Sequence, residues 1–249
     1  MKAIILGAGR GQRLMPHTDG CPKCFIEVEG RRLLDWGLEA LKGVGLDVVF
    51  VGGYLVEKVE EAYPELTYCY NADWRDTNIL FSLMQAEPYM GEGFVCAYAD
   101  ILYRPGILRA LMKSPHEITL ACDTAWRKRY ALRTEHPKED AEKMTAEGDG
   151  VIRIARDVPN DVARGEYIGV ARFGAEGAEA LRDAYHHAKA TYDGHPFRSA
   201  AMFKKAYSID LFQEMIDDGA EMHLVETEGG YFEIDTVQDY EIARREWTR

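Results

Sequence analysis

The strongest chemical signal in the chain comes from three glycines and two basic residues near its N-terminus. A short apolar run is followed by Gly7, Gly9 and Gly11, which let the backbone approach a ligand closely because glycine has no Cβ atom. Exposed amide N–H groups in such a loop form an anion site. The nearby Arg13 and Lys23 offer phosphate oxygens a planar bidentate fork and a mobile point charge. This segment therefore predicts a polyphosphate site.

The spacing differs from that of two common phosphate-binding loops. A P-loop carries a lysine directly after its last glycine, and none follows Gly11. The dinucleotide fingerprint G-x-G-x-x-G needs a glycine where this chain has Gln12. The loop therefore belongs to neither class.

Two aspartates are candidate metal ligands. Asp100 follows an apolar run that predicts a buried strand, and Asp235 stands between an expected strand and an expected helix. Mg²⁺ prefers oxygen ligands and commonly uses one or two carboxylates together with substrate phosphates. We expect this pair to hold Mg²⁺, which would neutralise charge during an in-line displacement at phosphorus. The alternatives are a strand-end cap for Asp100 and a helix N-cap for Asp235, with Thr236 and Asp239 expected in that same cap.

Composition limits the class of protein and its partners. The chain has 249 residues, 47% of them apolar, and a net charge of −12, which argues against DNA or RNA as a partner because nucleic acids require basic surfaces. We find no apolar run approaching the ~20 residues that span a bilayer, and no pattern of a signal peptide. We therefore expect a cytoplasmic enzyme without a membrane partner. The oligomeric state stays open, a homodimer included.

The cysteines and histidines carry less information. The five cysteines are an odd number and are scattered, which predicts reduced thiols. Cys21 and Cys24 have C-x-x-C spacing, but no second pair completes a tetrahedral zinc site. The seven histidines are interpreted as surface residues without a catalytic role.

Alternating strand and helix patterns predict an α/β fold in which helices flank a mostly parallel, Rossmann-like sheet. A charged segment at 124–149 predicts a small hairpin-like excursion that closes over the substrate. We expect a single domain over 1–249. Expected strands are 3–6, 25–28, 48–51, 67–70, 94–98, 118–122, 151–155, 167–173 and 223–225. Expected helices are 33–44, 56–63, 78–86 with Thr77 as its N-cap, 107–112, 176–190, 209–217 and one from Val237, preceded by a loop at 228–235.

The first 23 residues resemble the signature of the sugar-nucleotidyltransferase superfamily. The matching positions are Gly7, Gly9, Gly11, Arg13, Leu14, Pro16, Thr18, Pro22 and Lys23. Asn71 with residues 77–83, and residues 233–240, are similar to segments of cytidylyltransferases that act on phosphocholine and related small phosphoesters. With Tyr98-Ala-Asp100 and Tyr167-Ile-Gly169, the resemblance runs from residue 3 to about 240. It implies the nucleotide-diphospho-sugar transferase type of fold, with nucleotide binding in about 1–122 and acceptor binding in about 123–249.

The resemblance also implies a reaction, in which CTP and a phosphoester give a CDP-alcohol and pyrophosphate with Mg²⁺ as cofactor. Arg13 would bind the β- and γ-phosphates, and Lys23 would neutralise the α-phosphate and the attacking phosphate. The position of the family's acceptor-phosphate lysine falls near Arg156, which departs from the pattern. The implied nucleotide-binding residues are Leu6, Ala8, Gly9, Gly11, Thr77, Asn78, Ser82 and Ala99.

The acceptor is less well defined by the sequence. A choline head would need an aromatic cage, and Trp126 is the foremost candidate because it stands in a charged segment. The candidate acceptor residues are Trp126, Tyr130, Arg156, Tyr167, Gly169 and Phe212, with Tyr231 and Phe232 as further aromatic candidates. The basic residues at 127–133 indicate either a second anionic group on the substrate or a solvated face, and Asp140 and Glu142 could receive a primary amine.

Phosphocholine is the favoured acceptor. The alternatives are aminoethylphosphonate, a sugar 1-phosphate, and a nucleotide sensor without catalysis. A sugar 1-phosphate would call for Asp, Glu and Asn side chains that bind hydroxyl groups in place of an aromatic cage.

Overall fold

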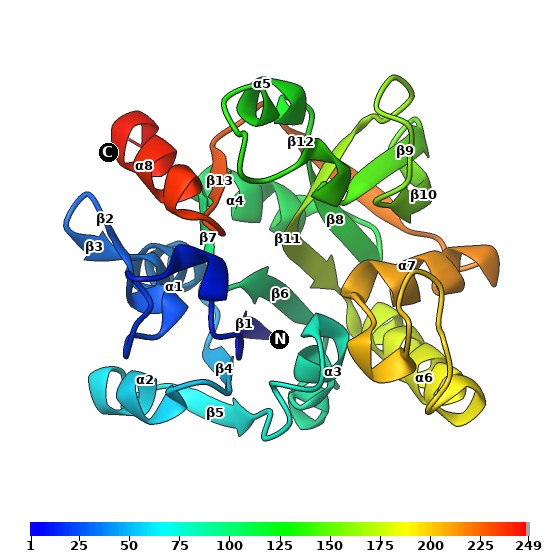
Figure 1. Ribbon diagram of the computed structural model, residues 1–249. Coiled ribbons are helices and arrows are strands. Elements are labelled where there is room, and N and C mark those ends of the chain that lie inside the picture. Colours follow the sequence, from blue (N-terminus) through cyan, green and yellow to red (C-terminus); the bar gives the residue numbers. More distant parts are fainter. Residues whose placement is uncertain (248–249) are drawn as a thin grey trace.

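The computed structural model describes residues 1–247 and is built around one nine-stranded sheet (Figure 1). In spatial order the strands are β5 (Thr67–Tyr70), β4 (Val48–Gly52), β1 (Lys2–Gly7), β6 (Phe94–Tyr98), β11 (Gly165–Phe173), β8 (Ile118–Asp123), β12 (His223–Thr227), β10 (Gly150–Ala155) and β9 (Lys143–Glu147). The helices are α1 (Leu33–Lys42), α2 (Val56–Ala62), α3 (Ile79–Met84), α4 (Pro105–Lys113), α5 (Trp126–Tyr130), α6 (Ala175–Tyr192), α7 (Ser208–Asp217) and α8 (Val237–Glu246).

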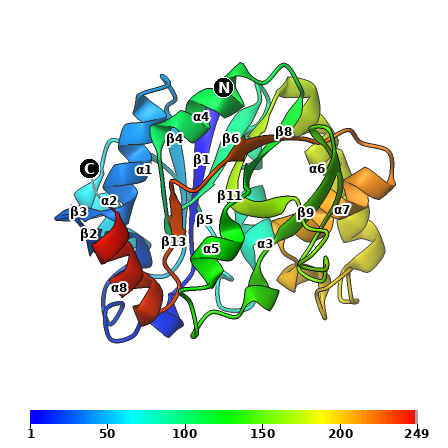
Figure 2. The ribbon, with the colours of Figure 1, turned by 90° about the horizontal axis from the view of Figure 1, so that it is seen from above.

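Both faces of the sheet are covered, which explains why its first strands read as unbroken apolar runs. Along β1, Ile4 packs into one hydrophobic cluster and Ile5 into the other, because successive side chains of a strand point to opposite faces. The first cluster is completed by α3, α6 and α7, and the second by α1, α2 and α4. Figure 2 shows α1 on one side of the strands and α6 and α7 on the other. Within residues 1–247, no helix is both long and apolar enough to cross a membrane.

The expected α/β class is confirmed, but the sheet is mixed rather than mostly parallel. The strands β5, β4, β1 and β6 run parallel, whereas β11 is antiparallel to both β6 and β8. The turn at 148–149 joins β9 directly to β10, and so short a connection permits only an antiparallel pair. The charged segment at 124–149 does contain part of this hairpin, which adds to the far edge of the sheet, and it also forms α5.

Three short strands are not among the expected elements because each is too brief to show periodicity. Two of them form a ribbon that pairs β7 (Ile101–Tyr103) with β13 (Tyr231–Glu233), the latter within the expected loop at 228–235. The third, β3 (Arg31–Arg32), forms a small hairpin with β2 (Glu27–Val28), whereas β2 itself lies within the strand expected at 25–28. The ribbon matters most, because Asp100 precedes its first strand and Asp235 follows its second.

Candidate active site

A cavity of about 950 Å³ opens where β1 and β6 end, at the edge of an open α/β sheet where ligands bind. One wall is the glycine loop after β1, and the opposite wall includes side chains next to β9, β10 and β11. Most of the site residues proposed from the sequence line this cavity. They are Leu6, Ala8, Gly9, Gly11, Arg13, Lys23, Thr77, Asn78, Ser82, Ala99, Asp100, Arg156, Tyr167, Gly169 and Asp235.

The glycine loop is held close to its neighbours at two points. A Cβ on Gly7 would lie 2.4 Å from the Phe50 ring, and a Cβ on Gly11 would lie 3.0 Å from the Lys23 side chain. Gly11 also has a φ of 69°, a left-handed conformation that glycine adopts without strain. The Thr18 hydroxyl donates a hydrogen bond of 2.8 Å to the Gly11 carbonyl. The loop backbone therefore faces the cavity while the Lys23 stem lies against it.

The Lys23 ammonium lies between the two predicted metal ligands. Its Nζ is 2.6 Å from Asp100 Oδ2 and also contacts Asp235 Oδ1, and Arg13 Nη2 lies 2.6 Å from Asp235 Oδ2. Burial disfavours the charged forms of both Lys23 and Asp235. The two carboxylates nevertheless raise the pKa of Lys23 above its usual value. Lys23 and Arg13 outweigh the effect of burial on Asp235 and lower its pKa to about 2. The cluster therefore holds two cations and at least one ionised carboxylate at neutral pH.

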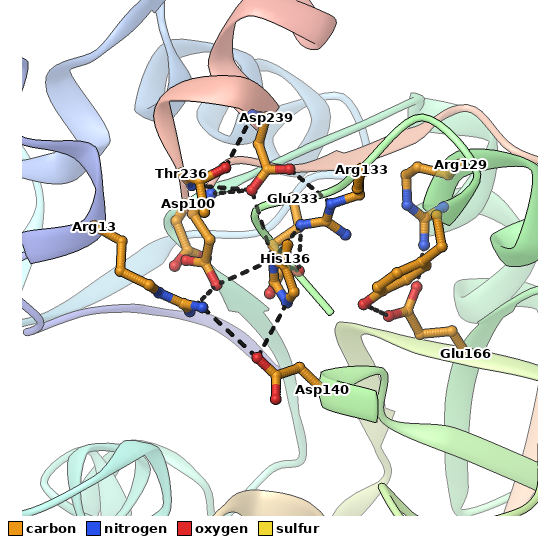
Figure 3. Close-up of polar contacts among 12 residues, drawn as sticks. Arg13, Asp100, Arg129, Arg133, His136, Asp140, Glu166, Glu233, Thr236 and Asp239 are labelled. Carbon is orange, nitrogen blue, oxygen red and sulfur yellow. Dashed lines mark hydrogen bonds and ion pairs between the residues drawn. The ribbon is translucent and has the colours of Figure 1, made fainter. Parts of the chain in front are cut away.

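The β7–β13 ribbon brings Asp100 and Asp235 together from positions 135 residues apart in the chain (235 − 100). The backbone N–H of Ile234 donates a hydrogen bond of 3.0 Å to the Asp100 carbonyl. Beyond the ribbon, the Thr236 hydroxyl accepts from the Asp239 N–H, and the Asp239 carboxylate accepts from the Thr236 N–H (Figure 3). This capping box starts α8, as expected. The cap is made by Thr236 and Asp239 and does not use the Asp235 side chain. That side chain contacts Lys23 and Arg13 instead.

The carboxylates fit a divalent cation. Asp100 Oδ1 is buried and has no hydrogen-bond partner among residues 1–247, and such an orphaned carboxylate oxygen is the kind of atom that a bound cation satisfies. Oxygen ligands from one or two carboxylates are also what Mg²⁺ takes at phosphate sites. Glu233 is the last residue of β13, two residues before Asp235. Burial and the nearby Asp235 raise the pKa of Glu233 to about 7.

His136 is a site residue that the sequence analysis missed. It lines the cavity with 3% of its side chain exposed, so the interpretation of all histidines as surface residues is wrong here. Its Nδ1 contacts Arg133 and lies 3.5 Å from Asp239, and its Nε2 lies 3.8 Å from Asp140 (Figure 3). The segment around it has no periodic pattern that could have indicated burial.

Arg13 also reaches the far side of the cavity. Its Nη1 lies 3.7 Å from Asp140 Oδ2, and the two side chains point toward each other (Figure 3). Both are partly exposed, at 53% and 38% of the side chain. An ion pair between the glycine loop and the charged segment therefore lies across this part of the cavity.

The expected nucleotide side is organised around a buried asparagine. Asn71 donates hydrogen bonds of 2.9 Å to both Thr77 Oγ1 and Ser82 Oγ. The N-cap of α3 is Asn78, whose side chain accepts from the Ile79 N–H at 2.8 Å, and not Thr77 as expected. Asn71 thus fixes Thr77 and Ser82 at the cavity wall.

The opposite wall pairs a buried carboxylate with an arginine. Arg156 Nη2 lies 3.4 Å from Glu142 Oε1, and its guanidinium stacks over the Tyr207 ring at 3.8 Å. Burial raises the pKa of Glu142 to about 8. Within residues 1–247, Arg156 Nε and the hydroxyls of Tyr98 and Tyr167 are buried without hydrogen-bond partners. Both tyrosines line the cavity, so this wall presents unmet hydrogen-bonding capacity to a ligand.

A left-handed glycine brings those two tyrosines together. Gly169 in β11 has a φ of 73°, and a Cβ there would lie 2.4 Å from the Tyr98 ring. The register of β11 against β8 shifts between Tyr167 and Ala171. The Tyr98 and Tyr167 rings then meet edge to face.

The expected aromatic cage is not formed by its foremost candidates, which lie in the core. Trp126 is 1% exposed and packs with Tyr130, Ala141, Val158 and Ala163 in a small cluster of its own. Phe212 packs against Tyr167 and Phe173 in the main core. Tyr130 donates a hydrogen bond to Glu166, a residue of the cavity wall, at 2.8 Å. The charged segment buries its aromatic residues because it forms a satellite core on the edge of the sheet.

The basic residues of that segment are largely paired. Arg129 is buried and binds both Asp123 and Glu166. Arg133 is buried and lies 2.6 Å from Asp239. Neither fits the interpretation as a solvated face, and their charges are already neutralised by carboxylates of the protein.

The chain resembles known nucleotidyltransferases over most of its length. A family model described as a MobA-like NTP transferase domain matches residues 3–223. The CTP:phosphoglutamine cytidylyltransferase of Campylobacter jejuni is 28% identical over 97% of this chain and 98% of its own. The choline-phosphate cytidylyltransferase of Streptococcus pneumoniae is 31% identical over 47% of this chain and 52% of its own.

A solved structure supports the fold. The CTP:phosphocholine cytidylyltransferase from Streptococcus pneumoniae superposes with a TM-score of 0.74 at 23% identity, over 99% of both chains. The nucleotide-diphospho-sugar transferase type of fold is thereby confirmed.

Proposed function

Because this chain belongs to the MobA-like NTP transferase family and is therefore a nucleotidyltransferase, we propose that it transfers CMP from CTP to a small phosphorylated or phosphonate acceptor. The observation that carries the proposal is the Lys23 ammonium, held between Asp100 and Asp235 beside the glycine loop. CTP is the nucleotide named in the relative that matches over nearly the whole chain. The proposed role of Asp100 and Asp235 as metal ligands also argues against a nucleotide sensor without catalysis.

The reaction needs positioning and charge neutralisation more than covalent chemistry. An acceptor phosphate oxygen is already a nucleophile, so it attacks the α-phosphorus of CTP directly. The new bond joins that oxygen to the α-phosphorus, and the bond to the β-phosphate oxygen breaks and releases pyrophosphate. Lys23 neutralises the α-phosphate, and Arg13 binds the leaving phosphates. Mg²⁺ held by Asp100 and Asp235 would supply further charge neutralisation when bound.

We propose that the acceptor carries an amino group. Glu142 is a buried carboxylate on the acceptor wall, 3.4 Å from Arg156. Arg156 would bind the acceptor phosphate bidentately, which frees Glu142 to receive an ammonium group. Phosphoglutamine and aminoethylphosphonate both combine an anionic phosphorus group with an amine. Phosphocholine remains a second candidate because Tyr98, Tyr167, Tyr207 and Tyr231 line the cavity and ring faces attract quaternary ammonium.

A pyrophosphate-release assay tests both levels of the proposal. The four nucleoside triphosphates are each combined with phosphoglutamine, aminoethylphosphonate, phosphoethanolamine, phosphocholine and a hexose 1-phosphate, with Mg²⁺ present. We expect the highest kcat/KM for CTP with an acceptor that carries a primary amine. Preference for a hexose 1-phosphate would contradict the proposed acceptor class. Binding of CTP without turnover of any acceptor would favour a nucleotide sensor.

A further inference from the structure

Two histidines and an aspartate, residue types that can bind a metal ion, meet at the end of the sheet away from the cavity. His116 precedes β8, Asp149 lies in the turn between β9 and β10, and His223 begins β12. One ligand atom from each lies within 4.8 Å of the other two. The strand β8 runs from this cluster to Asp123, which binds Arg129 behind the cavity wall. Six residues of strand therefore separate the two places, which is about 20 Å.

The three side chains lie within reach of one ion. One imidazole must turn to bind it together with the other, because the in-plane lone pairs of two stacked rings run parallel. The His116 and His223 rings are stacked, with centroids 3.4 Å apart and planes inclined by 7°. His116 Nε2 lies 3.2 Å from Asp149 Oδ2. In the described part of the chain, His223 Nδ1 is buried and has no hydrogen-bond partner. A buried polar atom without a partner is rare in native proteins, and an ion or an ordered water is the usual explanation.

We propose that His116, Asp149 and His223 bind a divalent transition metal ion of the zinc class. Imidazole nitrogens and a carboxylate oxygen are ligands that Zn²⁺ takes, with water in the remaining position. Mg²⁺ would not suit this set, because it favours oxygen ligands. Binding draws the three ligand atoms closer together. The Asp149 side chain has room to move because 61% of it is exposed.

The position of the site gives the metal a structural role. The strand β10 pairs with β12 only around Gly150 and His223, through two backbone hydrogen bonds of 2.8 Å. A metal bound here would link the turn of the β9–β10 hairpin to both β8 and β12. The other end of the same hairpin carries Glu142 and Arg156, which line the cavity. The metal would therefore stabilise the hairpin that supports the acceptor wall.

Metal binding by the full-length protein tests the site. The protein is stripped with a chelator, kept in excess Mg²⁺ so that the carboxylates of the cavity are occupied, and titrated with Co²⁺ and then Zn²⁺. Four proteins are compared, namely wild type, Asp149→Asn, the double variant His116→Gln/His223→Gln, and His187→Gln. His187 is an exposed histidine on α6, so its variant controls for the loss of any histidine.

We expect wild type and His187→Gln to bind the same number of Co²⁺ ions, and the double variant to bind one fewer. Asp149→Asn should lower the affinity for that ion at least tenfold. This single variant keeps the test valid if the double variant does not fold. Equal stoichiometry and affinity in wild type and Asp149→Asn would overturn the proposal.

Hydrogen exchange tests the structural role separately. Zn²⁺ should slow amide exchange over residues 143–156 in wild type and not in the double variant. Binding without this protection would overturn the role in the hairpin. Neither result depends on the nucleotide or the acceptor, so both are separable from failure of the proposed cytidylyl transfer.

Discussion

The two walls of the cavity differ in the chemical groups that line them. The wall after β1 is mainly backbone, with glycines that bring main-chain groups close to the ligand and a single lysine between two aspartates. The opposite wall is made of partly buried charged and aromatic side chains, such as Glu142 and Arg156, which are paired with each other. Backbone amides bind any polyphosphate in much the same way. A wall of paired charges distinguishes one small acceptor from another, because each buried group must find a partner.

The strongest way to disturb the acceptor wall alone is to remove its satellite core. Trp126→Ala deletes a fully buried indole and should lower the free energy of unfolding by about 3–5 kcal/mol, as measured by urea denaturation. Trp74→Ala is the matched control, because Trp74 lines the cavity and is partly buried. A loss of stability no larger than that of the control would mean that the cluster around Trp126 does not support the fold.

The glycine-loop wall is best tested at Lys23. Lys23→Ala removes the ammonium that neutralises the α-phosphate and should lower kcat roughly 10²–10³-fold, measured by pyrophosphate release. Lys189→Ala, on the exposed face of α6, should retain wild-type turnover. Circular dichroism should show both variants folded. If folded Lys23→Ala turns over within twofold of wild type, Lys23 does not take part in the reaction.

The acceptor wall should respond to the charge of Glu142. Glu142→Gln keeps the shape of the side chain and should raise KM for an amino-bearing acceptor roughly tenfold, with KM for CTP little changed. Because burial raises the pKa of Glu142 to about 8, the wild-type kcat/KM for that acceptor should rise between pH 6 and 8. The profile of the variant should be flatter. Equal changes in both KM values would assign Glu142 to the fold and not to the acceptor.

The smallest effect concerns the stability of the free enzyme. Burial raises the pKa of Glu142 from 4.5 to about 8, so the folded protein keeps a proton that the unfolded chain releases. This contribution to stability is complete below pH 4.5 and is lost as the pH rises through 8. Glu142→Gln should therefore lose less in Tm between pH 7 and pH 9 than wild type. Over this range the difference in stability is about 1.4 kcal/mol, which is roughly 3–5 °C in Tm by differential scanning fluorimetry. Parallel pH profiles for the two proteins would contradict this.

The same contrast explains what could be predicted from the sequence. The glycine loop lies within one short stretch, so its residue types and spacing were enough to predict it. Asp100 and Asp235 were predicted as a pair of metal ligands, but the β7–β13 ribbon that brings them together was not, because strands of three residues show no periodicity. His136 was missed because nothing local signals its burial. Trp126 was wrongly placed in the acceptor site. An aromatic residue in a charged segment can belong either to a ligand cage or to a satellite core, and only tertiary packing decides between them.

The ion pair between Arg13 and Asp140 has a consequence for the binding of the acceptor. Exposed pairs of this kind contribute about 0–1 kcal/mol, so an incoming triphosphate can exchange Asp140 for its own oxygens on Arg13 at little cost. Asp140 then keeps its contact with His136 and its electrostatic interaction with Arg156, but it loses the Arg13 guanidinium. A bound triphosphate would thus change the electrostatics of the pocket that the acceptor meets, so the affinity for the acceptor should differ between the free and the nucleotide-bound enzyme.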